Sequence, residues 1–101
     1  MNRHVVRYRT KPELADENAR LIQNVFLELA AKAPAGLRYA VLRLSDDTFL
    51  HVIERDEGPN PLQGYESFRA FSGTVKERCL EAPQFCDAVV IGNYRMIGTT
   101  T

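Results

Sequence analysis

The residues of this chain best suited to proton-transfer chemistry are a histidine and two tyrosines. His51 stands in the middle of Thr48–Arg55, an alternating stretch that predicts a β-strand. An imidazole titrates near pH ~6.5, so a histidine in an apolar interior can act as a general acid or base. The alternative is a histidine that packs in the core and hydrogen-bonds a neighbour, since the sequence shows no partner for it.

Tyr8 and Tyr94 are the phenols that we expect near His51. Tyr8 belongs to the strand His4–Thr10, where Val6 and Tyr8 point to one side. Tyr94 comes close to Tyr8 if the last predicted strand pairs with the first. A phenol and an imidazole beside an apolar cavity would orient a hydroxylated aromatic compound. Core packing with one satisfied hydroxyl is the alternative for each tyrosine.

The sequence predicts no metal site and no cofactor. Neither of its two histidines has a second ligating residue close by in the chain, and Cys79 and Cys86 do not form a Cys-x-x-Cys pair. We expect two reduced thiols that pack as small apolar side chains, with a disulfide or a metal site as the alternative. No glycine-rich phosphate-binding loop is present, so we expect no flavin.

Hydrophobic periodicity predicts six elements that would position these residues. The strand His4–Thr10 is followed by a helix that runs to Pro34, with Leu14, Asn18 and Ile22 in its apolar stripe. The remaining elements are two strands (37–44 and 48–55), a second helix (about 65–80) and a last strand (87–96). This β-α-β-β-α-β order is the split βαβ, or ferredoxin-like, arrangement, an α+β fold.

The turn Ser45-Asp46-Asp47 sets the expected register of the central hairpin. If this turn is tight, the helix-facing side of the hairpin carries Ala40, Leu42, Leu44, Phe49, His51 and Ile53. We therefore expect Leu42 opposite His51. The other side carries Tyr39, Val41, Leu50 and Val52, an apolar stripe of the kind that monomers seldom leave exposed. This stripe predicts a homodimer formed by sheet-to-sheet packing.

Further side chains are candidates for lining a ligand cavity. Tyr65 and Phe68 open the second helix at the expected entrance, and Phe26 and Leu42 are expected between the sheet and the helices. The alternative is that these side chains fill the core. The expected core residues are Phe26, Leu42, Ile53, Phe68 and Phe71.

Composition limits the classes of function. The 101 residues fit one domain, 1–101. Thirteen basic residues balance thirteen acidic ones, so there is no basic excess for binding nucleic acid or an anionic membrane surface. No apolar run approaches the ~20 residues that span a bilayer. The first residues lack the apolar region of a signal peptide, so we expect a cytoplasmic location.

Four stretches carry a resemblance to a known family. They are the opening strand with Lys11-Pro12, the segment Pro34–Tyr39, the strand Phe49–Glu54, and Ser67–Phe71 in the second helix. With this element order, the chain resembles the dimeric α/β-barrel superfamily, above all its antibiotic-biosynthesis-monooxygenase-like branch. The resemblance implies a four-stranded antiparallel sheet in the order fourth, first, third, second. It also implies a homodimer with its sheets face to face and a cavity between sheet and helices in each subunit.

The superfamily includes cofactor-independent oxygenases, haem-degrading enzymes, lactone isomerases and proteins with no known reaction. The branch often carries a histidine where this chain has Ser67, and the chain has no tryptophan. We therefore expect a small-ligand-binding homodimeric domain. The alternatives are a cofactor-independent monooxygenase or isomerase acting on a small hydrophobic cyclic compound, with His51 transferring the proton and Tyr8 orienting the substrate, and a structural dimer with a filled interior.

Overall fold

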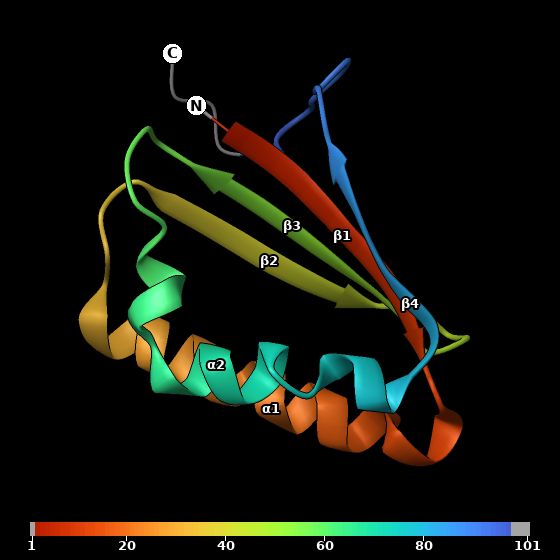
Figure 1. The fold of residues 1–101 in the computed structure, drawn as a ribbon. Coiled ribbons are helices and arrows are strands. Elements are labelled where there is room, and N and C mark those ends of the chain that lie inside the picture. The colour runs from red at the N-terminus through yellow and green to blue at the C-terminus, as the bar shows by residue number, and fades with distance from the viewer. Residues whose placement is uncertain (1, 98–101) are drawn as a thin grey trace.

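A computed structural model of the chain describes residues 2–97. The strands are β1 (Asn2–Thr10), β2 (Leu37–Arg43), β3 (Thr48–Arg55) and β4 (Cys79–Asp87), and the helices are α1 (Ala15–Lys32) and α2 (Glu66–Ser72). Short 3₁₀ turns cover Pro12–Leu14, Pro61–Gly64 and Val75–Arg78. The antiparallel sheet has the order β2-β3-β1-β4 and lies over the two helices (Figure 1). The predicted ferredoxin-like α+β fold is confirmed.

Helix α1 supplies the largest apolar stripe of the helical layer. Its buried side chains, Ala15, Asn18, Ile22 and Val25, follow the three-to-four residue spacing of one helix face. The helix ends at Ala33, which adopts a left-handed conformation (φ 42°) and donates its N–H to the carbonyl of Leu29.

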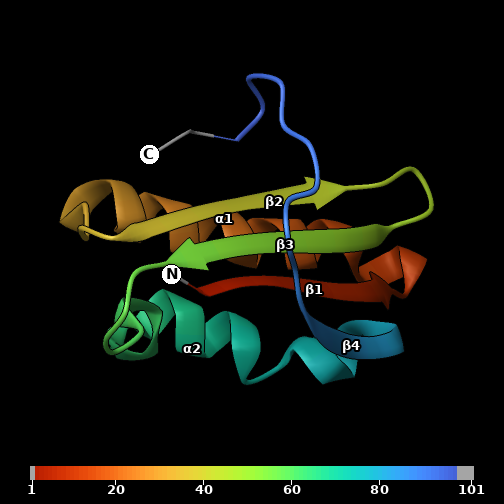
Figure 2. The same cartoon turned by 90° about the horizontal axis from the view of Figure 1, so that it is seen from above.

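Both helices cover the same face of the sheet. Seen from above, α1 runs along the β2 side and α2 along the β1 side (Figure 2). The buried core between these layers comprises Tyr8, Ile22, Val25, Phe49, Leu62, Tyr65, Phe71 and Val75. Of the predicted core residues, Phe71 is buried, and Phe26 and Phe68 pack against the core.

The second helix is shorter than predicted. Helix α2 ends at Ser72, and Gly73 and Thr74 separate it from the 3₁₀ turn Val75–Arg78. Glycine carries a large conformational entropy cost within a helix, and here it marks the end of α2. The sequence prediction carried the helix through this break to Leu80.

The last strand lies earlier in the chain than predicted. The prediction placed it at 87–96, centred on the β-branched residues 89–91, but β4 is Cys79–Asp87. The position of the 3₁₀ turn Val75–Arg78 explains the difference. This turn ends beside the end of β1, where the N–H of Lys11 donates to the carbonyl of Arg78. Cys79 then pairs with Thr10, and the pairing of β4 with β1 ends where Asp87 lies opposite His4.

The register of β2 also differs from the prediction by one residue. The hairpin loop spans residues 44–47: the N–H of Leu44 donates to the carbonyl of Thr48, and Asp47 adopts a left-handed φ of 65°. Val41, not Leu42, therefore lies opposite His51. A one-residue shift moves every side chain to the other face. Tyr39 and Val41 consequently face the helices, and Leu42 is exposed on the open face.

The open face of the sheet combines apolar side chains with a buried carboxylate. Glu54 is only 4% exposed and accepts hydrogen bonds from Arg3 and Arg38. Burial acts to raise the pKa of Glu54, but these two guanidiniums outweigh burial and lower it. After β4, the segment 88–97 crosses above this face (Figure 2).

Candidate functional site

A buried chain of hydrogen bonds crosses the interior between the sheet and the helices. The hydroxyl of Tyr39 lies 2.6 Å from Nδ1 of His51, and Nε2 of His51 lies 2.8 Å from the hydroxyl of Tyr8. The amide nitrogen of Asn18 donates to Tyr8 at 2.9 Å, and Nε of Arg78 donates to Oδ1 of Asn18 at 2.8 Å. Five polar side chains are thus connected in one line.

Each member of the chain comes from a different element. Tyr39, His51 and Tyr8 stand on the helix-facing side of β2, β3 and β1, while Asn18 projects from α1 and Arg78 from the last 3₁₀ turn. Three of these elements are neighbouring strands, so the two phenols flank the imidazole. Aromatic packing fixes the rings: the His51 ring stacks on Phe71 at 5.3 Å, and the Tyr8 ring stacks on Phe49 at 5.6 Å.

Arg78 anchors the inner end of this chain. Its side chain is 5% exposed, and besides Asn18 it donates to Oγ1 of Thr74 at 2.6 Å and to the carbonyl of Phe71 at 3.0 Å. Within residues 2–97 no carboxylate lies within ion-pair distance of it. Neutral acceptors, including a carbonyl at the end of α2, therefore satisfy this buried cation.

Burial keeps the three titratable rings of this hydrogen-bond chain, those of His51, Tyr8 and Tyr39, neutral at pH 7. Desolvation lowers the pKa of His51 from its ordinary 6.5 to about 4. Burial also raises the pKa of the Tyr8 and Tyr39 hydroxyls well above their ordinary value of 10. The imidazole at the centre of the chain can therefore donate one hydrogen bond and accept one.

The outer end of the hydrogen-bond chain, Tyr39, lies at a groove between α1 and the sheet. The groove has a volume of about 800 Å³, and Tyr39 lines it. Its other lining residues are Ala19, Ile22, Gln23, Phe26, Leu27, Ala40, Val41, Arg43 and Phe49. The rings of Phe26 and Tyr39 stack on each other at 4.9 Å. The groove thus presents mainly apolar and aromatic groups, with a phenol among them.

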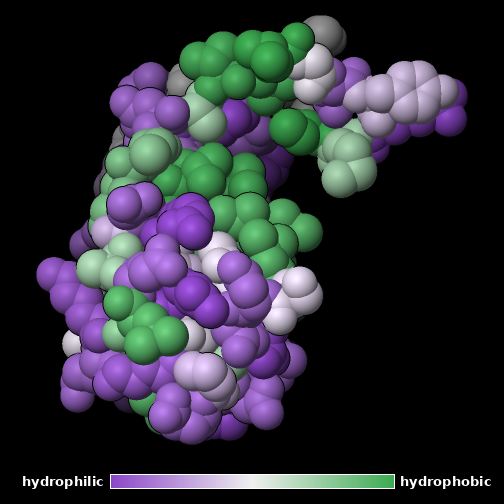
Figure 3. Space-filling model, turned by 90° about the vertical axis from the view of Figure 1, so that its right-hand side faces the viewer, coloured by the Kyte–Doolittle hydropathy of each residue, from purple (hydrophilic) through white to green (hydrophobic). Residues whose placement is uncertain are grey.

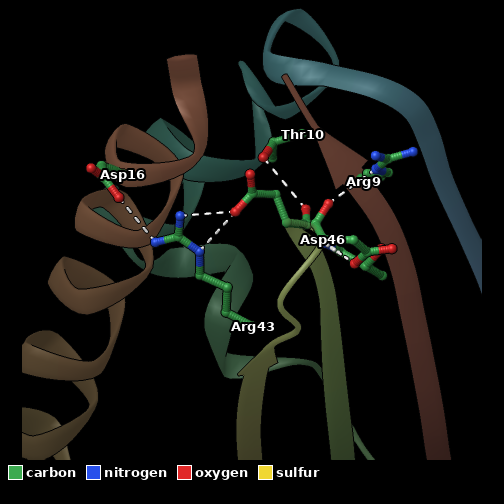
Figure 4. Close-up of polar contacts among 7 residues, drawn as sticks. Arg9, Thr10, Asp16, Arg43 and Asp46 are labelled. Atoms are coloured by element: carbon green, nitrogen blue, oxygen red, sulfur yellow. Dashed lines mark hydrogen bonds and ion pairs between the residues drawn. The ribbon is translucent and has the colours of Figure 1, made fainter. Parts of the chain in front are cut away.

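An ion-pair cluster ties one end of the groove together. Arg43 on β2 donates to Oδ1 of Asp16 on α1 at 3.0 Å and to Oδ1 of Asp47 at 2.9 Å (Figure 4). Arg9 donates to the backbone carbonyl of Asp46 in the same loop. The cluster joins the central hairpin to α1 and to β1, so the hairpin that carries Tyr39 is held against the helical layer.

The structure brings together some of the predicted site residues and separates others. His51 and Tyr8 contact each other, but Tyr8 is only 1% exposed and lies behind His51, away from the groove lining. Phe26 lines the groove. Tyr65 is buried in the core and Phe68 packs against the core. Leu42 lies on the open face, because of the register difference, and Tyr94 is 80% exposed beyond β4.

Sequence reasoning missed three members of the hydrogen-bond chain. Tyr39 was assigned to the open face by the wrong register. Arg78 was not among the expected interior residues, yet it is buried. Asn18 carried a usable signal, because it is a polar residue within the apolar stripe of α1 and is fully buried.

Ser67, on α2, forms a hydrogen bond to α1. Its hydroxyl donates to Oε1 of Glu28 on α1 at 2.5 Å, and Glu28 also pairs with Lys32. The hydrogen bonds from Lys32 and from Ser67 lower the pKa of Glu28 to about 2. Ser67 therefore joins α2 to α1.

Three further findings concern metal ligands, cysteines and membrane-spanning helices. Within residues 2–97, no cluster of three or more His, Cys, Asp or Glu side chains is arranged to hold a metal ion. Both cysteines of the chain are free thiols. No helix in this range is long and apolar enough to cross a membrane.

The depressed pKa of His51 predicts a protein that loses stability in mild acid. Between pH 6.5 and about 4, the unfolded chain binds a proton at His51 that the folded chain does not. Stability therefore rises with pH in this window and falls on acidification, by about 2–3 kcal/mol between pH ~6.5 and pH ~4.5. Urea unfolding at a series of pH values measures this loss.

The matched control is His51→Gln, which keeps an uncharged hydrogen-bonding side chain. All other titratable groups are common to both proteins, so the difference between their pH profiles reports His51 alone. The variant should lack the extra slope. Parallel profiles for the two proteins would contradict a buried, neutral His51.

No protein-family model and no curated protein matches the sequence. The structure is similar to the crystal structure of an antibiotic biosynthesis monooxygenase, with a TM-score of 0.65 and 15% identity over 91% of this chain and 100% of that one. It is also similar to a conserved protein from Methanosarcina mazei Go1, with a TM-score of 0.67 and 19% identity over 85% of this chain and 88% of that one.

A third similar structure is that of an uncharacterized NIPSNAP domain protein from Burkholderia xenovorans, with a TM-score of 0.61 and 13% identity over 98% of this chain and 100% of that one. At these identities the likeness concerns the fold. The chain therefore has the ferredoxin-like fold of the antibiotic-biosynthesis-monooxygenase-like proteins.

Proposed function

We propose that this chain is a small-ligand-binding domain that takes a hydrophobic cyclic compound into the groove between α1 and β2. The groove carries this proposal, because its volume of about 800 Å³ falls in the range of small-molecule sites and its lining is mainly apolar. The stacked rings of Phe26 and Tyr39 offer an aromatic surface for a planar ligand. The Tyr39 hydroxyl adds a polar group that can orient such a ligand.

Filling the groove should abolish binding. Ala19 lies in the groove lining on α1, so Ala19→Phe would place a ring in the space that a ligand needs. Titration with tetralin and α-tetralone, followed by chemical shifts of the groove residues, should show at least about 10-fold weaker binding to this variant. Ala70→Phe makes the same change at an exposed position of α2 and should bind as the unmodified protein does. Equal affinities for all three proteins would contradict a ligand site in the groove.

A second candidate function is cofactor-independent oxygenation of a phenol- or quinol-like compound. The contact that favours it is the 2.6 Å hydrogen bond between His51 and the groove-lining Tyr39, which connects a ligand bound in the groove to the imidazole. The quinol-like substrate would supply all four electrons that dioxygen takes up: two as the quinol becomes a quinone, and two as one oxygen atom is inserted into a ring C–H bond. The other oxygen atom leaves as water. His51 would be the proton-transfer group.

Removing His51 tests this second function. With a dihydroxynaphthalene under air, His51→Ala should reduce turnover by about 10²–10⁴-fold, as is usual for loss of a general acid or base. His4→Ala is the matched control, since His4 contacts Asp87 and lies outside the chain of hydrogen bonds. Equal rates for the unmodified protein and the His51 variant would exclude this role.

We also propose that the protein is a homodimer in which two open sheet faces meet. After correction of the β2 register, this face carries Ala40, Leu42, Leu50, Val52 and Val5 as its apolar side chains. Beyond β4, the segment 88–97 adds Val89, Ile91, Tyr94 and Met96, each at least 80% exposed. Figure 3 shows hydrophobic surface gathered where this segment projects from the body of the protein. A second copy would remove this surface from water.

A charge at the centre of the open face should disrupt the dimer. Val52 pairs with Val5 and Ala40 on its two neighbouring strands, so Val52→Lys would place an ammonium within the proposed contact. Sedimentation should show a dimer for the unmodified protein and a monomer or an unfolded chain for the variant. Ala30→Lys adds the same charge on an exposed position of α1 and should remain dimeric. A monomeric unmodified protein would contradict the proposal.

A further inference from the structure

The chain of hydrogen bonds has a direction, and Arg78 sets it. A guanidinium can only donate, so the amide oxygen of Asn18 must face Arg78, at 2.8 Å from its Nε. The amide nitrogen of Asn18 must then face Tyr8, to which it donates at 2.9 Å. This contact settles which way the Asn18 amide points, and it makes the Tyr8 hydroxyl an acceptor on the α1 side.

The proton of Tyr8 has one acceptor. Tyr8 is 1% exposed, and apart from Asn18 its hydroxyl has a single partner within residues 2–97, Nε2 of His51 at 2.8 Å. A buried hydroxyl that left this acceptor unused would lose a hydrogen bond. Tyr8 therefore donates to Nε2, and the neutral imidazole of His51 carries its own proton on Nδ1.

The same logic determines the state of Tyr39. Nδ1–H of His51 points to the Tyr39 hydroxyl at 2.6 Å, so this hydroxyl accepts from the protein. It keeps its own proton, for which residues 2–97 provide no other partner. Tyr39 is half-buried and lines the groove, so the unused proton is available to a molecule bound there.

We propose that Tyr39 is a hydrogen-bond donor to ligands in the groove, and that the groove selects cyclic hydrophobic compounds carrying a carbonyl or other acceptor oxygen. This inference rests on the proposed function of the groove as a ligand site. Tyr39 is the binding residue, whereas His51, Tyr8 and Asn18 are positioning residues. A ligand whose polar group can only donate finds less to bind at this hydroxyl.

One nearly isosteric substitution should reverse the donor-to-acceptor direction of the hydrogen bonds from Asn18 to Tyr39. In Asn18→Asp, both carboxylate oxygens accept, so the side chain can accept from Arg78 and from Tyr8 at once. Tyr8 then accepts from Nε2–H of His51, and Nδ1 of His51 accepts the proton of Tyr39. The Tyr39 hydroxyl would offer only lone pairs to the groove. The new carboxylate faces Arg78, which favours a folded variant.

The tautomer of His51 tests the direction of the chain without any ligand. Nitrogen-15 NMR of the imidazole should show the proton on Nδ1 in the unmodified protein and on Nε2 in Asn18→Asp. A proton on Nε2 in the unmodified protein would overturn the proposal. This measurement on the unmodified protein alone determines the direction of the hydrogen bonds, even if the variant fails to fold.

Three probes of similar shape test the preference for an acceptor: α-tetralone carries a carbonyl, tetralin has no polar group, and tetrahydroquinoline carries an N–H donor. The unmodified protein should bind α-tetralone about 2- to 10-fold more tightly than tetralin, the range expected for one net hydrogen bond. Tyr39→Phe should remove this preference. Asn18→Asp should remove it too and should favour tetrahydroquinoline instead.

The pattern of failure separates the two proposals. If none of the three probes binds, the groove is not a ligand site, and the proposed function fails together with the donor role. If all three bind the unmodified protein equally, the groove binds ligands but the donor role of Tyr39 is overturned. If the preference for α-tetralone survives in Tyr39→Phe, another residue provides the donor and the proposal is wrong.

Discussion

The hydrogen bond from Arg78 to Asn18 is the contact on which the interior of this protein depends. Arg78 is a buried cation, and burying a charge without hydrogen-bonding partners is costly. Its three acceptors come from α1, from the end of α2 and from Thr74, so the position of the last 3₁₀ turn is tied to both helices. That turn ends beside β1, where the pairing of β4 with β1 begins. The same contact also orients the buried polar side chains around His51.

The groove depends on a second constraint, the four-residue loop of the central hairpin. A shift of one residue in this loop would place Tyr39 on the open face and leave Nδ1 of His51 without its partner. Asp47 holds a left-handed conformation in the loop, and its side chain pairs with Arg43. The geometry of this turn therefore determines which residue can meet a ligand.

The sequence was sufficient for the order of elements, because β1, β2, β3 and both helices follow the hydrophobic spacing of their type, whereas the last strand was placed too late in the chain. It was not sufficient for the register of β2, because Leu37, Tyr39 and Val41 on one side are about as apolar as Ala40, Leu42 and Leu44 on the other. His51 was identified as a residue facing the helices. Tyr8 was expected near it, but Tyr39 was missed because of the register, and Asn18 and Arg78 are linked to it only through Tyr8, by contacts between residues distant in sequence. A buried polar residue inside an apolar stripe, as Asn18 is, was the available signal.

The displaced fourth strand links the fold to assembly. Because β1 pairs with β3 on one side and β4 on the other, the β-branched residues 89–91 have no place beside β1, and Val89 and Ile91 are exposed. In the proposed dimer, a second copy would cover them together with the open face. The groove lies on the helix side of the sheet, so ligand binding and association would use alternate side chains of one strand: Tyr39 and Val41 toward the ligand, and Leu42 toward the partner. Strand β2 is then the element through which the two events can influence each other.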